Sequence, residues 1–179
     1  MIKIHGSSGI EFPNNYSIKS DSGDLTVMND VNKLWGMNST GYESKPKLPL
    51  FKVRKSSAIT STGDVIFDTV IFNQENFYDN TTGRATAPIS GYYFLMVKIN
   101  HHNRIDIRIQ VNDSGGLETG YGYNEIGQYN TSNLGSWNSA YLITEAYMNV
   151  GDYANIYISN LYQNTDPDMW THFSGYLLG

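Results

Sequence analysis

Apolar residues occupy every second position from residue 105 to residue 111, and the positions between them are polar. The apolar residues are Ile105, Ile107, Ile109 and Val111, and the polar residues are Asp106, Arg108 and Gln110. This period of two is typical of a β-strand with one side against a core and the other side in solvent. Residues 153–159 alternate in the same way after a Gly-Asp turn at 151–152, and they predict a second such strand.

Three further segments have strand-like residue types in a different pattern. Residues 65–72 and 92–97 are apolar on both sides, which indicates strands covered by a second sheet or by a neighbouring subunit. Residues 140–148 contain good helix formers, but their Tyr, Ile and Thr favour a strand. Regularly spaced strands without alternating helices predict a β-sandwich or jelly roll.

The first 50 residues differ in character from the rest. They offer only short β segments separated by Gly, Pro, Asn and Ser, at residues 2–4, 10–12 and 25–28. Such short segments bury too little apolar surface to offset their ordering entropy. We therefore expect residues 1–50 to form a short irregular β segment that folds against copies of itself or a larger assembly, and residues 51–179 to form the main domain.

Composition strengthens the all-β prediction. The 179 residues include 17 Gly, 14 Tyr and 19 Asn, but only 8 Lys and 6 Glu. Tyr favours strands, Gly and Asn favour turns, and the straight-chain residues that make helices are scarce. The chain has no Cys, which excludes thiol nucleophiles, cysteine-ligated zinc and iron–sulfur clusters.

Charge and hydropathy disfavour nucleic acids and membranes as partners. The net charge is −5 and the 12 basic residues are scattered, so nucleic acid is a poor partner. No apolar run approaches the roughly 18 residues of a membrane span, and the first six residues lack the length and apolar core of a signal peptide. We expect no membrane partner. If the protein acts outside a cell, we expect it to leave the cell by a route other than signal-peptide secretion.

A series of short motifs in the main domain has a characteristic order and spacing. They are Ile66-Phe67-Asp68 with Asn73, Tyr78-Asp79 with Gly83, Thr86-Ala87-Pro88, Gly91-Tyr92-Tyr93-Phe94, Gly151-Asp152 and Phe173-Ser174-Gly175-Tyr176-Leu177-Leu178. Over residues 51 to 179 the series resembles the globular head domain of the C1q family, in the C1q and tumour-necrosis-factor superfamily. Two departures are Ala85, where the family usually carries an aromatic residue, and the absence of a collagen-like Gly-X-Y stalk.

The resemblance implies a ten-stranded jelly-roll sandwich that assembles as a homotrimer and binds partners through exposed loops, without enzymatic activity. Residues 2–13 carry a second resemblance, to the opening of phage structural and fibre proteins. This resemblance implies a virion protein that is released by lysis, with the N-terminal segment attached to other virion proteins.

Few residues suggest catalysis or metal binding. His101 and His102 are adjacent on a predicted strand, so they point to opposite faces and do not share a metal. A glycan hydrolase needs paired acids, and the available pairs are those of residues 166–168, in turn-like Asp-Pro-Asp, and Glu118 with Glu125. We predict no catalytic residue and no cofactor, with calcium at loop acids or on the trimer axis as the remaining candidate ion.

Aromatic residues gather among Gly, Asn and Ser in residues 117–137. We predict that the ligand-binding residues are Tyr121, Tyr123, Tyr129 and Trp137, together with Trp170. Tyr, Trp, Ser and Asn are the residues of adaptable binding loops, and aromatic faces flanked by amides suit sugar rings. The alternative for each aromatic residue is a place in a subunit interface or at the base of a loop.

Three functions follow from these patterns. The favoured one is a trimeric virion fibre or tip protein that recognises a host surface glycan or protein. The second is a capsid decoration or head-fibre subunit without receptor binding. The third, a bacterial or eukaryotic C1q-like recognition module, is disfavoured by the missing signal peptide and collagen stalk. The first two both require a trimer, an anchor and exposed loops, so the sequence does not separate them.

Overall fold

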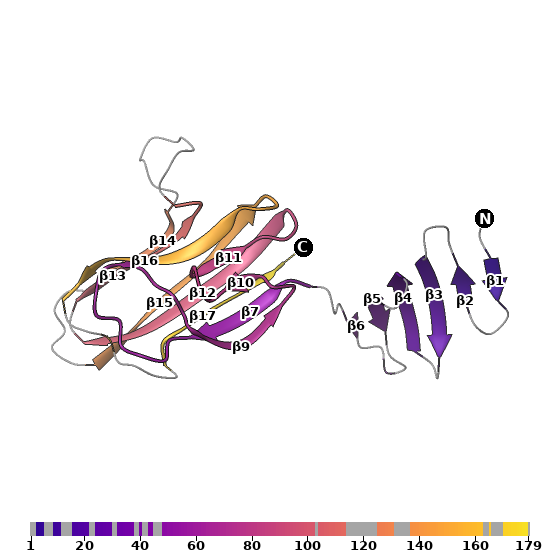
Figure 1. Cartoon of the computed structure of the whole chain (residues 1–179), viewed down its shortest axis with the longest axis horizontal. Coiled ribbons are helices and arrows are strands. Elements are labelled where there is room, and N and C mark those ends of the chain that lie inside the picture. The colour runs from indigo at the N-terminus through magenta and orange to yellow at the C-terminus, as the bar shows by residue number, and fades with distance from the viewer. Residues whose placement is uncertain are drawn as a thin grey trace. The chain divides into compact units, whose positions relative to one another are not determined.

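The computed structural model divides the chain into two compact units, Met1–Leu48 and Pro49–Gly179 (Figure 1). It describes residues 3–5, 9–11, 16–21, 24–29, 32–37, 40, 43–44, 48–102, 104–113, 125–130, 137–162, 165 and 170–178. These residues form strands and turns, and none of them lies in a helix, which confirms the all-β prediction. Accordingly, the described residues include no helix long and apolar enough to span a membrane.

The N-terminal unit is an antiparallel sheet whose six strands follow one another in chain order (Figure 1). The strands are β1 (Lys3–His5), β2 (Gly9–Glu11), β3 (Tyr16–Asp21), β4 (Asp24–Asn29), β5 (Asn32–Met37) and β6 (Glu43–Ser44). The sheet is more regular than the sequence predicted, because β3, β5 and β6 were not predicted. In β3 and β5 the apolar residues are interrupted by Ser, Lys, Asp or Asn, so the apolar pattern of these strands is weak. Their pairing with adjacent strands depends instead on backbone hydrogen bonds.

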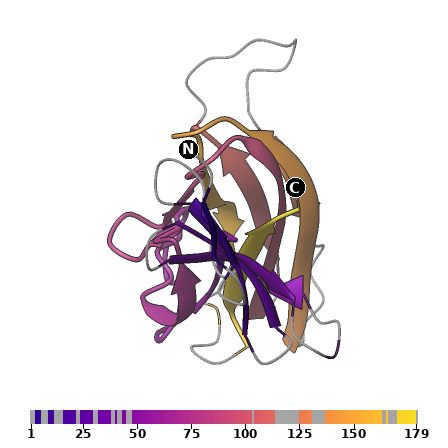
Figure 2. The ribbon, with the colours of Figure 1, turned by 90° about the vertical axis from the view of Figure 1, so that its right-hand side faces the viewer.

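The second unit is a jelly-roll sandwich of two sheets (Figures 1 and 2). Its strands are β7 (Leu50–Arg54), β8 (Gly63–Asp64), β9 (Thr69–Gln74), β10 (Tyr78–Asp79), β11 (Arg84–Thr86), β12 (Gly91–His102), β13 (Ile105–Val111), β14 (Glu125–Asn130), β15 (Trp137–Met148), β16 (Tyr153–Leu161) and β17 (His172–Leu177). One sheet has the order β15-β12-β17-β7-β9, and the other has the order β10-β11-β16-β13-β14, with the short β8 beside β16. The segment that was ambiguous between helix and strand is strand β15.

The core lies between the two sheets. Ile105, Ile107 and Ile109 of β13 are fully buried, as their alternation predicted. The expected solvent side of β13 is wrong, because Asp106 and Gln110 are also buried. β13 is an inner strand between β16 and β14, so its outward residues are flanked by a strand on each side and do not lie at an open edge.

Aromatic rings fill the centre of the core. The ring centroid of Phe51 lies 5.1 Å from that of Phe77 and 4.8 Å from that of Phe173, both edge to face. Ala85, the departure from the family pattern, is fully buried in β11 opposite Tyr78. The Tyr78 ring also stacks on Phe51 at 5.2 Å, so an aromatic residue from a neighbouring strand lines this part of the core.

The predicted strand at residues 65–72 is wrong in its first half, because β9 begins at Thr69. Residues 65–68 cross from one sheet to the other, since β8 pairs with β16 and β9 pairs with β7. Val65 and Phe67 are nevertheless buried, and the Phe67 N–H donates to the Tyr78 hydroxyl oxygen at 2.9 Å. The apolar pattern therefore predicted the burial of Val65 and Phe67 correctly, but it did not predict that the chain crosses between the two sheets here.

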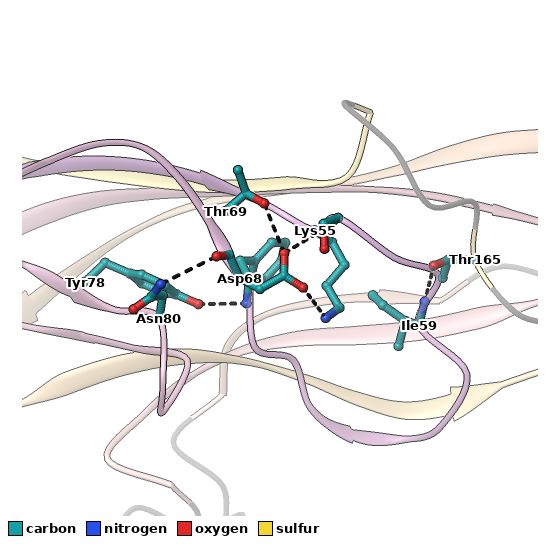
Figure 3. A network of polar contacts seen from close by, with 9 residues as sticks. Lys55, Ile59, Asp68, Thr69, Tyr78, Asn80 and Thr165 are labelled. Carbon is teal, nitrogen blue, oxygen red and sulfur yellow. Dashed lines mark hydrogen bonds and ion pairs between the residues drawn. The ribbon is translucent and has the colours of Figure 1, made fainter.

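A network around Asp68 fixes this crossing (Figure 3). The Asp68 carboxylate accepts hydrogen bonds from Lys55 Nζ and from the Ser56 N–H, both at 2.8 Å. Burial by itself raises the pKa of Asp68, but the hydrogen bonds from Lys55 and Ser56 outweigh it and lower the pKa to about 2. The ionised carboxylate thereby ties the crossing to the end of β7.

The next motif residues shape the turns that follow. Asn73 makes two hydrogen bonds to the backbone of Tyr78, at 2.7 and 2.9 Å. Asp79 accepts a hydrogen bond from the Thr81 N–H at 2.8 Å, and Gly83 closes the turn with φ +80°. A Cβ at Gly83 would lie 2.9 Å from the Val65 carbonyl oxygen, so this turn requires glycine.

Candidate assembly and recognition surfaces

The sheet that contains β12, β15 and β17 buries alternate side chains in the core and turns the others outward. The outward apolar residues are Tyr92, Phe94, Met96, Tyr141, Ile143, Tyr147 and Tyr176. We call this surface the assembly face. Tyr92, Tyr141, Ile143 and Tyr147 are each more than half exposed, although they lie within long strands.

Strand register sets these residues side by side on one face, with the exposed Glu145 as the charged residue among them, opposite Phe94. Tyr92 lies opposite Tyr147, and their rings meet edge to face with centroids 5.2 Å apart. Phe94 lies opposite Tyr176 on β17, and these rings stack at 5.1 Å. An aromatic side chain offers roughly 150–250 Å² of surface, so the assembly face reaches the several hundred Å² that mark interaction surfaces.

One end of this sheet is basic as well as aromatic. Lys98 Nζ lies 5.3 Å from the ring centroid of Tyr141 and 4.9 Å from that of Trp170. Opposite Lys98 is the half-buried His172, and burial together with nearby Lys52 and Lys98 lowers the pKa of His172. Trp170 is thus exposed at the border of the assembly face, held against a cation.

The structure describes some of the predicted ligand-binding residues and not others. Tyr121 and Tyr123 lie outside the described residues. The backbone of Tyr129 lies in β14 opposite Ile107, and the backbone of Trp137 begins β15 opposite His102. Register places these two positions at the end of the domain where β12 passes to β13, and Trp170 precedes β17 at the same end. Their role in binding stays a prediction.

The assembly face includes residues that the sequence reasoning did not select. Tyr141, Ile143 and Tyr147 lie in a segment predicted as a strand, but the sequence pattern indicated a covering sheet or subunit only for residues 65–72 and 92–97. A signal was present, because both alternating sets of residues 140–148 are largely apolar. Two apolar sides on one strand indicate a core on one side and a second covering surface on the other.

A polar network lies on the other sheet. The Asn155 side-chain amide donates to Asp64 Oδ1 at 2.9 Å and to Asp113 Oδ1 at 3.0 Å, and Arg84 pairs with Asp113 at 2.6 Å. Burial and the neighbouring Asp113 raise the pKa of Asp64. Within the described part of the chain, no three acidic or histidine side chains gather as metal ligands would. The calcium candidate stays a prediction for loop acids or a trimer axis.

Known proteins share the sequence pattern of this second unit. Residues 50–178 match the C1q domain family. Over 136 residues the chain is 28% identical to a complement C1q subcomponent of Mus musculus, an alignment that covers 73% of this chain and 52% of the mouse protein. Over 51 residues it is 35% identical to the corresponding complement C1q subcomponent of Bos taurus, covering 28% of this chain and 21% of the bovine protein. The chain thus spans about half or less of these relatives.

Solved structures share its fold. The globular domain of zebrafish complement 1qA protein superposes with a TM-score of 0.55 at 17% identity, covering 74% of this chain and 98% of that chain. Murine APRIL at pH 5.0 superposes with a TM-score of 0.60 at 12% identity, covering 74% of this chain and 100% of that chain. These likenesses confirm the expected jelly roll. Since the family match extends over most of the sequence, the chain belongs to the C1q domain family.

Proposed function

We propose that this protein is a homotrimeric recognition protein that assembles through the assembly face and binds a surface ligand at the end of the domain where β12 passes to β13. C1q-like and tumour-necrosis-factor-like domains typically form homotrimers and act in recognition rather than catalysis. The observation that carries the proposal is the largely aromatic surface of β12, β15 and β17.

The shape of this surface suits a subunit interface better than a small-molecule site. It is spread over three adjacent strands. Stable interfaces bury roughly 800 Å² per partner and are rich in Tyr and Phe, which matches the residues found here. In a trimer the exposed rings would be covered by neighbouring copies. Each copy would then no longer expose to solvent an apolar patch of a size that is rare on soluble monomers.

A trimer also supports weak recognition. Trp170 and the positions of Tyr129 and Trp137 lie at one end of the domain, so threefold symmetry repeats them three times. Repetition raises the strength of weak contacts by roughly 10²-fold or more when the ligand is itself repetitive, as surface glycans are. We propose a neutral surface glycan as the ligand, because aromatic faces flanked by Asn and Ser bind sugars without needing charge.

We propose a phage particle as the place of this trimer, with residues 1–50 attached to other virion proteins. The support is the resemblance of residues 2–13 to phage fibre proteins. The second candidate function is that of a capsid decoration protein without receptor binding. Such a protein would also be a trimer, but it would bind no glycan.

Mass measurement tests the trimer. Light scattering of the purified full chain should give about 60 kDa, three times the 20.1 kDa of one copy. A species of one-copy mass at micromolar concentration would contradict the proposal.

Glycan adsorption tests recognition. Trp170→Ala, Trp137→Ala and Tyr123→Ala should each weaken adsorption to immobilised surface glycans by about tenfold or more, since one aromatic platform is lost three times per trimer. Trimer mass and melting temperature should stay unchanged. Wild-type adsorption in all three variants would favour the decoration protein, and early melting would place these residues in the core or interface.

A further inference from the structure

The N-terminal sheet separates apolar and polar residues between its two faces. Strand register aligns Ile10, Ile18, Val27 and Trp35 in one row across β2, β3, β4 and β5. Residues directly opposite one another in adjacent strands lie on the same face of a sheet. The row therefore forms an apolar band across four strands.

Residues two positions away along each strand share this face. They include Tyr16, Leu25 and Met37, all of which are exposed. We call the surface made by the row and these three residues the N-terminal apolar face. The opposite face holds Ser17, Lys19 and Thr26 at the alternating positions, with Met28 as an apolar residue opposite Ser17, so it is mostly polar.

Among the residues of Met1–Leu48 that the structure describes, none forms a second layer over the N-terminal apolar face. The strands described in Met1–Leu48 all belong to one sheet, and no second sheet or helix is described there. A sheet that is apolar on one face is stabilised when that face packs against another element. We therefore expect a partner to cover the N-terminal apolar face.

We propose that the N-terminal apolar faces of three copies of this chain cover one another. This inference rests on the proposed homotrimer. In the sequence, residues 45–49 link the N-terminal sheet to β7, and five residues reach at most about 17 Å, so in a trimer each N-terminal sheet is attached to the same assembly by a short tether. A short tether gives an effective concentration in the millimolar range, which favours these copies as the cover of the apolar face. The attachment to other virion proteins proposed above would use the other surfaces of residues 1–50.

Single cysteines test the proposal, because the full chain contains none. Leu25→Cys places a thiol on the N-terminal apolar face, where Leu25 is 41% exposed in one copy. Thr26→Cys is the matched control, adjacent in sequence but on the polar face and less exposed in one copy. In the native full chain, maleimide should label Cys at position 25 at least about tenfold more slowly than Cys at position 26, with equal rates in urea.

Copy-to-copy cross-linking identifies what covers the face. A photo-cross-linking amino acid at position 25 should join copies into covalent dimers and trimers, and the same residue at position 26 should not. Val27→Cys repeats the labelling on the same face if the Leu25 variant fails to fold. Light scattering on every variant reports the trimer separately.

Two outcomes would overturn the inference while the proposed trimer stands: equal labelling at positions 25 and 26 in a trimer, or slow labelling at 25 with cross-links only within one chain. A monomeric chain would overturn the proposed function first and this inference with it.

Discussion

Tyr147→Asp tests the assembly face most directly. Tyr147 lies in β15, is 54% exposed in a single copy, and meets Tyr92 edge to face. A carboxylate at this exposed position should not disturb the core of one copy. In the proposed trimer, the same carboxylate would be buried against a neighbouring copy without a partner.

The expected effect follows from the exposed surface. A tyrosine side chain buries roughly 150–250 Å², so covering a half-exposed ring removes about 100 Å² from water, worth about 2–3 kcal/mol at roughly 25 cal/mol per Å². The loss occurs in all three copies, and desolvation of each carboxylate adds to it. Since every 1.4 kcal/mol is about a tenfold change in an equilibrium constant, the trimer should dissociate at micromolar concentration.

Light scattering and sedimentation across a dilution series measure this effect. The matched control is Tyr162→Asp, because Tyr162 is 64% exposed but follows β16 in the other sheet. We expect Tyr147→Asp to be monomeric with wild-type circular dichroism and Tyr162→Asp to remain trimeric. A trimer in Tyr147→Asp, or equal dissociation of both variants, would refute the assignment of the assembly face.

Two further predictions concern the stability of the jelly roll. In Gly175→Ala the new Cβ would lie 2.8 Å from Leu95 Cδ2 and 2.9 Å from the Phe94 carbonyl oxygen, so we expect a free energy of unfolding lower by about 1–3 kcal/mol in urea titration; an unchanged midpoint would contradict this close packing. The low pKa of Asp68 means that its contribution is complete above the ordinary value of 3.8 and is lost as the pH falls through about 2. Asp68→Asn should therefore cost on the order of 1 kcal/mol at pH 6, allowing for partial exposure, and less at pH 2; an equal cost at both pH values would show that the charge is unimportant.

Local sequence pattern was sufficient for the fold class and for much of the core. The alternation from Ile105 to Val111 located β13, and two members of the motif series, Tyr78-Asp79 with Gly83 and residues 173–178, coincide with a turn and with strand β17. These features depend on neighbours in sequence. The steric demand for glycine at a positive φ and the two-residue period of a strand both act within a few residues.

Tertiary structure decided the features that depend on distant partners. Residues 65–68 look like the start of a strand, yet they cross between sheets because Val65 and Thr69 belong beside β16 and β7, respectively. Likewise, both sides of β15 are largely apolar, and only packing shows that Ala146 faces the core and Tyr147 faces outward. Periodicity reports that a side chain is suited to burial, whereas the partner that buries it is chosen by contacts between segments far apart in the chain.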